Sequence, residues 1–425
     1  MVKLKGISRR CMFAVAAGAL VVIGAASLSP ARAQEAAQEA EFGAPRWVAT
    51  WSVPPMKHGT SFGASRSFEN QTVQQIVYIS AGGTRVRVKL SNEYGVGDLI
   101  IGSAHIAVQS TGASILPESD RSLTFGGQTS VVIAEGTVAL SDPVSLSVPS
   151  NTSLAISVYV PQNTGFATYH ENATQTAYIS GPGDFSNAIA FPVQETAISR
   201  YWLTFIEVLP QKKVGVLAIF GDSVSEGATT TRDANRRVSD VLSRWFNPPR
   251  DPARLAVLNQ STGCGRLLRE FCGPSGVSRF ERDVLNAAGI THVVLALGLG
   301  DIIFPTAVGD PTQLASVDEI IAGIRQLIRQ ARMRGLKVYG ATISPNEGTT
   351  FTNTHTPENE AKRLALNHWI RTSREFDGVA DYDVALRDPS HPARLLPAYA
   401  APDNLHPNDA GHEALARAIA LSLRW

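Results

Sequence analysis

Residues 214–227 read VGVLAIFGDSVSEG, an apolar run that ends in a turn crowded with polar side chains. The run is short and does not alternate between apolar and polar residues, which is typical of a strand buried on both faces of a parallel sheet. The turn then carries Asp222, Ser223, Ser225 and Glu226 between two glycines. A hydroxyl placed between a buried strand and a helix start is exposed, and the N–H groups of the helix start can face an oxyanion. Ser223 is therefore a candidate nucleophile, although Asp and Ser also serve as ordinary helix caps.

Four further apolar runs repeat this pattern along the second half of the chain. They are RLAVLNQ at 254–260, HVVLALG at 292–298, KVYGATI at 337–343 and GVADYD at 378–383. Helical stretches separate them, most clearly at 317–331, where apolar residues recur at helical spacing. Five buried strands with helical crossovers predict an α/β fold over residues 212–425: a doubly wound, parallel five-stranded sheet with helices on both faces. Its chemical groups should lie at the carboxyl ends of the strands.

The first half of the chain has a different rhythm. In TRVRVKL, residues 84–90, valine and leucine alternate with basic residues, and clusters of Gly, Pro and Asn punctuate similar runs. This period of two indicates antiparallel strands with one buried face. We therefore expect an all-β sandwich or jelly-roll domain over residues 46–208.

Residues 1–33 have the pattern of an export signal peptide. A basic start precedes an apolar stretch at 12–28, and Ala31-Arg32-Ala33 offers a cleavage site before Gln34. A membrane anchor is the alternative, but the stretch is short and rich in Ala and Gly. Arg9-Arg10 also fits the twin-arginine route. The sequence thus predicts a periplasmic or secreted protein, a linker at 34–45, and no stable membrane insertion of the mature chain.

The charge balance argues against nucleic acid as a partner. Five of the 38 cationic residues lie within residues 1–33, so the mature chain keeps 33 against 37 acidic residues. No cluster of Lys and Arg stands out elsewhere. A mildly acidic chain of this kind lacks the basic surface that binding to nucleic acid requires.

Two cysteines, Cys264 and Cys272, remain after the predicted cleavage. In an oxidising compartment they can form a short-loop disulfide, and two free thiols are an equally open alternative. Neither has His or Cys neighbours at the spacing of a zinc site, so we expect no metal.

The base for a serine nucleophile is best sought in APDNLHPNDAGHEALA, residues 401–416. Asp403 precedes His406 by three residues in a predicted loop, so that it can hold one imidazole nitrogen while the other faces Ser223. The remaining histidines have no comparable setting. They are His58, His105 and His170 in the predicted β domain, His292 at a strand, His412 in the last helix, and His355, His368 and His391, which lack an acid in similar register.

With GDSVSEG and DNLHPN at the two ends of the α/β region, the sequence resembles the GDSL, or SGNH, family of serine esterases and lipases. The resemblance covers roughly residues 212–425 and implies a flavodoxin-like fold. More weakly, residues 46–208 resemble the accessory sandwich of exported bacterial members. The resemblance implies that Ser223 is the nucleophile and an oxyanion donor, that His406 is the general base and then acid, and that Asp403 orients His406. It also implies no cofactor.

Two blocks depart from the family pattern. In the second block, LNQSTGCGRLL at residues 258–268, Cys264 stands where the family usually has glycine. In the third block the chain reads Gly298-Leu299-Gly300-Asp301, without the family's asparagine. The predicted oxyanion hole is therefore built from the backbone N–H groups of Ser223, Cys264 and Gly300. An uncompensated loss of one donor costs about 100- to 1000-fold in turnover. Asn346 and Asn404 are candidate substitute donors.

The sequence thus predicts an exported serine esterase that acts on short-chain acyl esters, acetyl groups on carbohydrate among them. Its partner would be a small-molecule or carbohydrate ester. Two alternatives remain open. One is a carbohydrate-binding protein whose hydrolase site has lapsed, which the altered third block favours and the three covalent-catalysis residues oppose. The other is an acyltransferase that uses the same serine.

Overall fold

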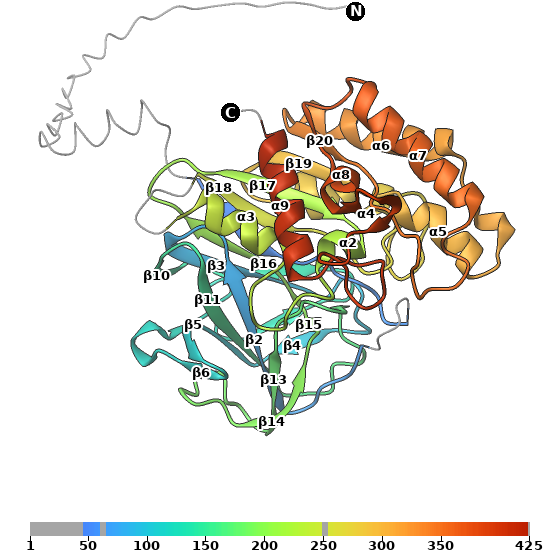
Figure 1. Cartoon of the computed structure of the whole chain (residues 1–425). Coiled ribbons are helices and arrows are strands. Elements are labelled where there is room, and N and C mark those ends of the chain that lie inside the picture. The colour runs from blue at the N-terminus through green and yellow to red at the C-terminus, as the bar shows by residue number, and fades with distance from the viewer. Residues whose placement is uncertain (1–45, 60–64, 249–253, 424–425) are drawn as a thin grey trace, which may run out of the picture. The chain divides into compact units, whose positions relative to one another are not determined.

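The computed structural model describes residues 46–59, 65–248 and 254–423, which belong to one compact unit. The predicted signal peptide and linker, residues 1–33 and 34–45, lie outside the described residues. In the described part, an antiparallel β part precedes an α/β part (Figure 1).

The α/β part is built on a parallel five-stranded sheet with the order β18-β17-β19-β20-β21. Its strands are β17 (Gly215–Gly221), β18 (Leu255–Asn259), β19 (Ile290–Ala296), β20 (Lys337–Ala341) and β21 (Gly378–Ala380). All five predicted strands are confirmed. Their apolar residues are almost entirely buried, which explains why the sequence runs show no alternation.

Helices cover both faces of this sheet. On one face α3 (Val238–Phe246) and α9 (Asp409–Ser422) pack together, with α8 (Tyr382–Leu386) beside α9. The other group contains α4 (Gly276–Phe280), α5 (Leu299–Ala307), α6 (Val317–Met333) and α7 (Pro357–Thr372) (Figure 1). The helix predicted at 317–331 is α6. It begins at a capping box in which Ser316 Oγ accepts from Glu319 N and the Glu319 carboxylate accepts from Ser316 N.

Within the described ranges, no helix is both long enough and apolar enough to cross a membrane.

Two antiparallel sheets form most of the β part. One contains β1 (Val48–Ser52), β16 (Leu203–Leu209), β3 (Gly83–Ser91), β10 (Val144–Val148) and β9 (Val138–Leu140). The other contains β14 (Val193–Ala197), β13 (Ala177–Pro182), β2 (Gln71–Ile79), β11 (Thr152–Val160), β5 (Ser103–Thr111), β6 (Ser114–Ile115) and β7 (Arg121–Ser122). Two-stranded pairs add β4 (Leu99–Ile101) with β8 (Val131–Ile133) and β12 (Tyr169–His170) with β15 (Arg200–Tyr201). The alternation read from residues 84–90 is confirmed, since Val86, Val88 and Leu90 are fully buried.

The β part packs directly against the α/β part. Strand β1 lies against β18, and Ala49 N donates to Ala288 O over 2.9 Å. Ser80 O accepts from Asn247 Nδ2 at 2.9 Å, and Ser80 Oγ accepts from Val257 N at 2.9 Å. The two parts share one core cluster. The division at 46–208 and 212–425 therefore stays a prediction about domains, while the change of architecture between them is observed.

Candidate active site

Ser223 is the first residue of a one-turn helix, α2 (Ser223–Glu226), at the carboxyl end of β17. Asp222 is the N-cap of this helix, and its Oδ1 accepts from Val224 N at 3.1 Å. Gly227 ends the helix at a φ of 94°, which favours glycine. The sharp strand-to-helix turn leaves Ser223 partly exposed while both neighbours are buried.

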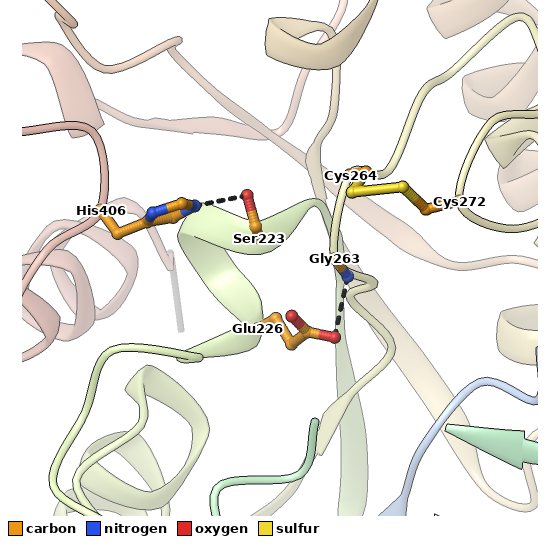
Figure 2. The surroundings of a disulfide bond; sticks show 6 residues. All are labelled: Ser223, Glu226, Gly263, Cys264, Cys272 and His406. Atoms are coloured by element: carbon orange, nitrogen blue, oxygen red, sulfur yellow. Dashed lines mark hydrogen bonds between the residues drawn. A yellow bond between two sulfur atoms is a disulfide. The ribbon is translucent and has the colours of Figure 1, made fainter. Parts of the chain in front are cut away.

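His406 meets the Ser223 hydroxyl. The distance from Ser223 Oγ to His406 Nε2 is 2.8 Å (Figure 2). On the far side of the ring, His406 Nδ1 is 2.7 Å from Asp403 Oδ2. Both residues lie in the loop between β23 (His391–Leu395) and α9. Thr229 Oγ1 donates to Pro407 O at 2.9 Å and so joins this loop to the segment that follows the nucleophile.

Asp403 is held in its ionised form. Burial opposes ionisation, but the imidazole of His406 and the N–H groups of His406 and Leu405 donate to the carboxylate, and together they lower the pKa of Asp403 to about 2. An ionised carboxylate only accepts hydrogen bonds, so Nδ1 of His406 carries the ring hydrogen. Nε2 is left free to accept a proton from Ser223.

Three backbone N–H groups are candidates for an oxyanion hole: those of Ser223, Cys264 and Gly300. None of them donates a hydrogen bond to any residue in the described ranges. Cys264 has a φ of 51°, a conformation that favours glycine and so fits the glycine usual at this position of the family. Its side chain is joined to Cys272 in a disulfide (Figure 2). Of the two alternatives left open by the sequence, the structure has the disulfide.

Gly300 lies against the backbone of the second block. A Cβ at this position would be 2.4 Å from Gly265 O, closer than real Cβ contacts. The next residue, Asp301, is fully buried and accepts from Leu267 N at 2.6 Å and from Leu268 N at 3.0 Å. The third block thus holds the second block in place, and the absence of an asparagine at 300 has a steric reason.

Neither candidate substitute donor has a hydrogen bond to Ser223 or His406 in the described part of the chain. Asn346 is buried, with its Nδ2 at 3.4 Å from Thr354 O and its Oδ1 at 3.3 Å from His355 Nδ1. Asn404 is exposed, at a φ of 53°. Their proposed role as donors gains no support from these contacts.

His412, for which no catalytic role is predicted, is a buried residue that connects two helices. It is fully buried in α9, and its Nδ1 accepts from Val238 N at 3.2 Å. Burial lowers the pKa of His412 to about 3, so the ring is neutral. It joins α9 to the start of α3.

Three further residues lie around the site that were not predicted to belong to it. Glu226 accepts from Gly263 N at 2.8 Å and faces His170 of the β part. Phe351 is 47% exposed, and its ring meets that of His406 edge-on with centroids 6.2 Å apart. Glu226 could have been noticed because it belongs to the GDSVSEG motif. Nothing in the local sequence of His170 or Phe351 points to the site.

No group of three or more His, Cys, Asp or Glu in the described ranges could hold a metal ion.

A serine hydroxyl presented at the end of a parallel sheet to a histidine held by an aspartate is the arrangement of a serine hydrolase. Residues 219–414 match the model of the GDSL-like lipase/acylhydrolase family. These residues thus form a GDSL-family esterase/acylhydrolase domain.

The chain is also similar to solved structures. A GDSL-like lipase from Bacteroides thetaiotaomicron is 16% identical, with 48% of this chain and 86% of that chain covered and a TM-score of 0.37. An aryl esterase from M. smegmatis is 15% identical, with 49% and 97% covered and a TM-score of 0.38. No curated protein matches the chain.

Proposed function

We propose that this protein is an exported serine esterase that hydrolyses short-chain acyl esters through an acyl-enzyme at Ser223. The observation that carries the proposal is the line of contacts from Asp403 through His406 to the Ser223 hydroxyl, at 2.7 and 2.8 Å. These are hydrogen-bond distances at which a base can take the proton of a nucleophile.

The reaction begins with attack of Ser223 Oγ on the ester carbonyl carbon. As the Oγ–C bond forms, the hydroxyl proton passes to His406 Nε2, and an electron pair of the carbonyl moves onto its oxygen. The free N–H groups of Ser223, Cys264 and Gly300 are available to this oxyanion. When the intermediate collapses, the bond to the leaving alcohol breaks and the alcohol takes the proton from His406.

Water then completes the cycle. His406 Nε2 takes a proton from the water as the water oxygen attacks the acyl carbon. The second intermediate releases the carboxylic acid, and the proton returns to Ser223 Oγ. Asp403 remains ionised throughout and stabilises the imidazolium of each step.

The expected substrates are short, soluble esters, including acetyl groups on carbohydrate. The loop beside His406, residues 342–356, is mostly polar and presents one exposed aromatic ring, that of Phe351. Such a surface suits a soluble ester better than a lipid interface, which an amphipathic apolar face would bind. Support for export comes from the pattern of residues 1–33 and from the Cys264–Cys272 disulfide, since disulfides persist in oxidising compartments.

The test is hydrolysis of p-nitrophenyl acetate, butyrate and octanoate by the chain beginning at Gln34. We expect activity that falls with acyl length and that drops by about 10⁴-fold or more in Ser223→Ala. Ser278→Ala is the matched control, because Ser278 is exposed on α4. Equal rates in the wild type and Ser223→Ala would contradict the proposal, and acyl transfer to added glycerol in place of water would favour the acyltransferase alternative.

A further inference from the structure

A buried histidine of the β part reaches the nucleophile helix. His170 lies in β12, and its Nε2 is 3.3 Å from Glu226 Oε1 in the last residue of α2. The side chains of His170 and Glu226 are only 3% and 4% exposed. On the other side of the ring, Nδ1 lies 3.0 Å from Pro54 O. The ring is thus fixed between a backbone carbonyl of its own region and a carboxylate of the GDSVSEG motif.

The two nitrogens of the His170 ring face different oxygen atoms. A carbonyl oxygen only accepts, so Nδ1 must carry a hydrogen toward Pro54. The contact between Nε2 and Oε1 is an ion pair when the ring is protonated. Removing the histidine donor would leave a buried carboxylate with less compensation, which costs free energy in proportion to its burial.

Glu226 also binds the second block. The same oxygen, Oε1, accepts from Gly263 N at 2.8 Å (Figure 2). Gly263 directly precedes Cys264, whose free N–H is a predicted oxyanion donor. Asn259 Nδ2 also donates to Ser225 O at 2.9 Å, so that α2 and the second block are joined twice. His170 therefore contacts Glu226, and Glu226 in turn accepts the hydrogen bond that orients the backbone just before Cys264.

The segment around His170 is docked by further hydrogen bonds to residues that follow the nucleophile. Ala173 O accepts from Arg237 Nη1 at 3.1 Å, and Thr176 N and Oγ1 each donate to Asp233 at 2.6 Å. These bonds hold the two segments together without touching α2. Loss of His170 should consequently disturb the nucleophile turn more than it disturbs the docking.

We propose that His170 is a positioning residue for ester hydrolysis: through Glu226 and Gly263 it holds the second block so that the Cys264 N–H faces the oxyanion. This inference rests on the proposed function. It gives the β part a direct role in the reaction, by fixing a donor that acts on the transition state and not on the bound ester.

The test compares two substitutions of His170, each of which keeps only one of the two contacts of the imidazole ring. His170→Gln places an amide N–H₂ near the position of Nε2 and can still donate to Glu226. His170→Asn places its amide near the position of Nδ1, keeps a donor for Pro54 O and loses Glu226. With p-nitrophenyl acetate we expect His170→Asn to lower kcat by about 10- to 100-fold with KM within about threefold, because a misplaced group costs roughly this much. His170→Gln should recover most of the lost kcat.

His105→Asn is the control. His105 lies on β5 of the same β part, where its Nδ1 is 3.0 Å from Asp120, and its loss should leave kcat unchanged. If His170→Asn has wild-type kcat, or if Asn and Gln lower kcat and Tm equally, the positioning role is wrong while Ser223-dependent hydrolysis by the wild type still stands. If the wild type shows no Ser223-dependent hydrolysis, the proposed function fails first, and this inference with it.

Should His170→Asn not fold, Glu226→Asp provides the second test. The shorter side chain withdraws the carboxylate from both Gly263 N and His170 Nε2, so the same fall in kcat is expected with little change in KM. Wild-type kcat in a folded Glu226→Asp protein would overturn the proposal.

Discussion

Gly300 illustrates how one residue can be fixed by a neighbour that is distant in sequence. Its Cα approaches Gly265 O so closely that a Cβ would lie 2.4 Å from that oxygen. The missing asparagine of the third block therefore cannot be restored by substitution alone. The backbone of the second block occupies the space that the side chain would need.

We expect Gly300→Asn to lower kcat by at least about tenfold and to destabilise the fold by about 1–3 kcal/mol, the usual cost of overpacking. Kinetics with p-nitrophenyl acetate and thermal denaturation measure the two effects. Gly273→Ala is the control, since its Cβ would meet Met56 Cε at an ordinary 3.5 Å. A rise in kcat at unchanged Tm would show that the hole does accept the asparagine.

Asp222 gives a prediction about pH. Burial raises the pKa of Asp222 to about 7, whereas an unfolded chain ionises this group at about 4. Between these values the folded state keeps a proton that the unfolded state has released, so stability falls as the pH rises through this window. Asp222→Asn keeps an oxygen to cap α2 and cannot ionise. The variant's Tm, measured from pH 4 to 7, should therefore decline less than that of the wild type.

Asp310→Asn is a suitable comparison, because Asp310 is also an N-cap but its hydrogen bonds lower its pKa, which places its titration below this window. Identical Tm profiles for Asp222→Asn and the wild type would rule out a buried, protonated Asp222.

At the scale of elements, the segment between β18 and α4 depends on the Cys264–Cys272 disulfide. The two cysteines are separated by eight positions, and the segment contains no regular helix or strand between 260 and 275. Closing so short a loop contributes about 2–3 kcal/mol in the chain-entropy model. The disulfide also restrains Cys264, whose N–H is one of the free donors.

Reduction with TCEP should consequently lower both Tm and kcat of the wild type. The double variant Cys264→Ala/Cys272→Ala should resemble the reduced protein and show no response to TCEP. An unchanged Tm on reduction, with loss of the disulfide verified by thiol titration, would contradict this expectation.

The elements themselves were the most predictable part of the molecule. All five strands of the parallel sheet and helix α6 could be predicted from the pattern of apolar residues. An element that is buried on one or two faces has apolar residues at a characteristic local spacing. Ser223, His406 and Asp403 follow from two motifs, and the structure brings them together. The contact of Gly300 with Gly265 and that of His170 with Glu226 have no such pattern, since each depends on how two distant loops approach one another.

At the scale of the whole molecule, the β part acts as a support for the α/β sheet. Strand β1 lies beside β18, and a Cβ at Gly289 would fall 2.8 Å from Val48 Cγ1. Buried side chains of both parts belong to the same cluster. The β part thereby contacts β18, an edge strand of the parallel sheet, where Val257 N donates to Ser80 Oγ.

We expect residues 212–425 expressed alone to aggregate or to unfold at a Tm well below that of residues 46–425. The larger protein should unfold in a single transition, because the shared core couples its two parts. Urea denaturation followed by tryptophan fluorescence and by circular dichroism provides the measurement. Two separated transitions, or a soluble and stable 212–425 fragment, would show that the parts fold independently.

The hydrogen bond between Ser223 and His406 joins residues 183 positions apart. During synthesis the ribosome therefore makes the nucleophile long before the base that activates it. A nascent chain halted at any codon between Gly227 and His406 contains the complete GDSVSEG motif and yet has no base for its serine. Translation itself thus delays the appearance of activity until almost the whole hydrolase domain has been made.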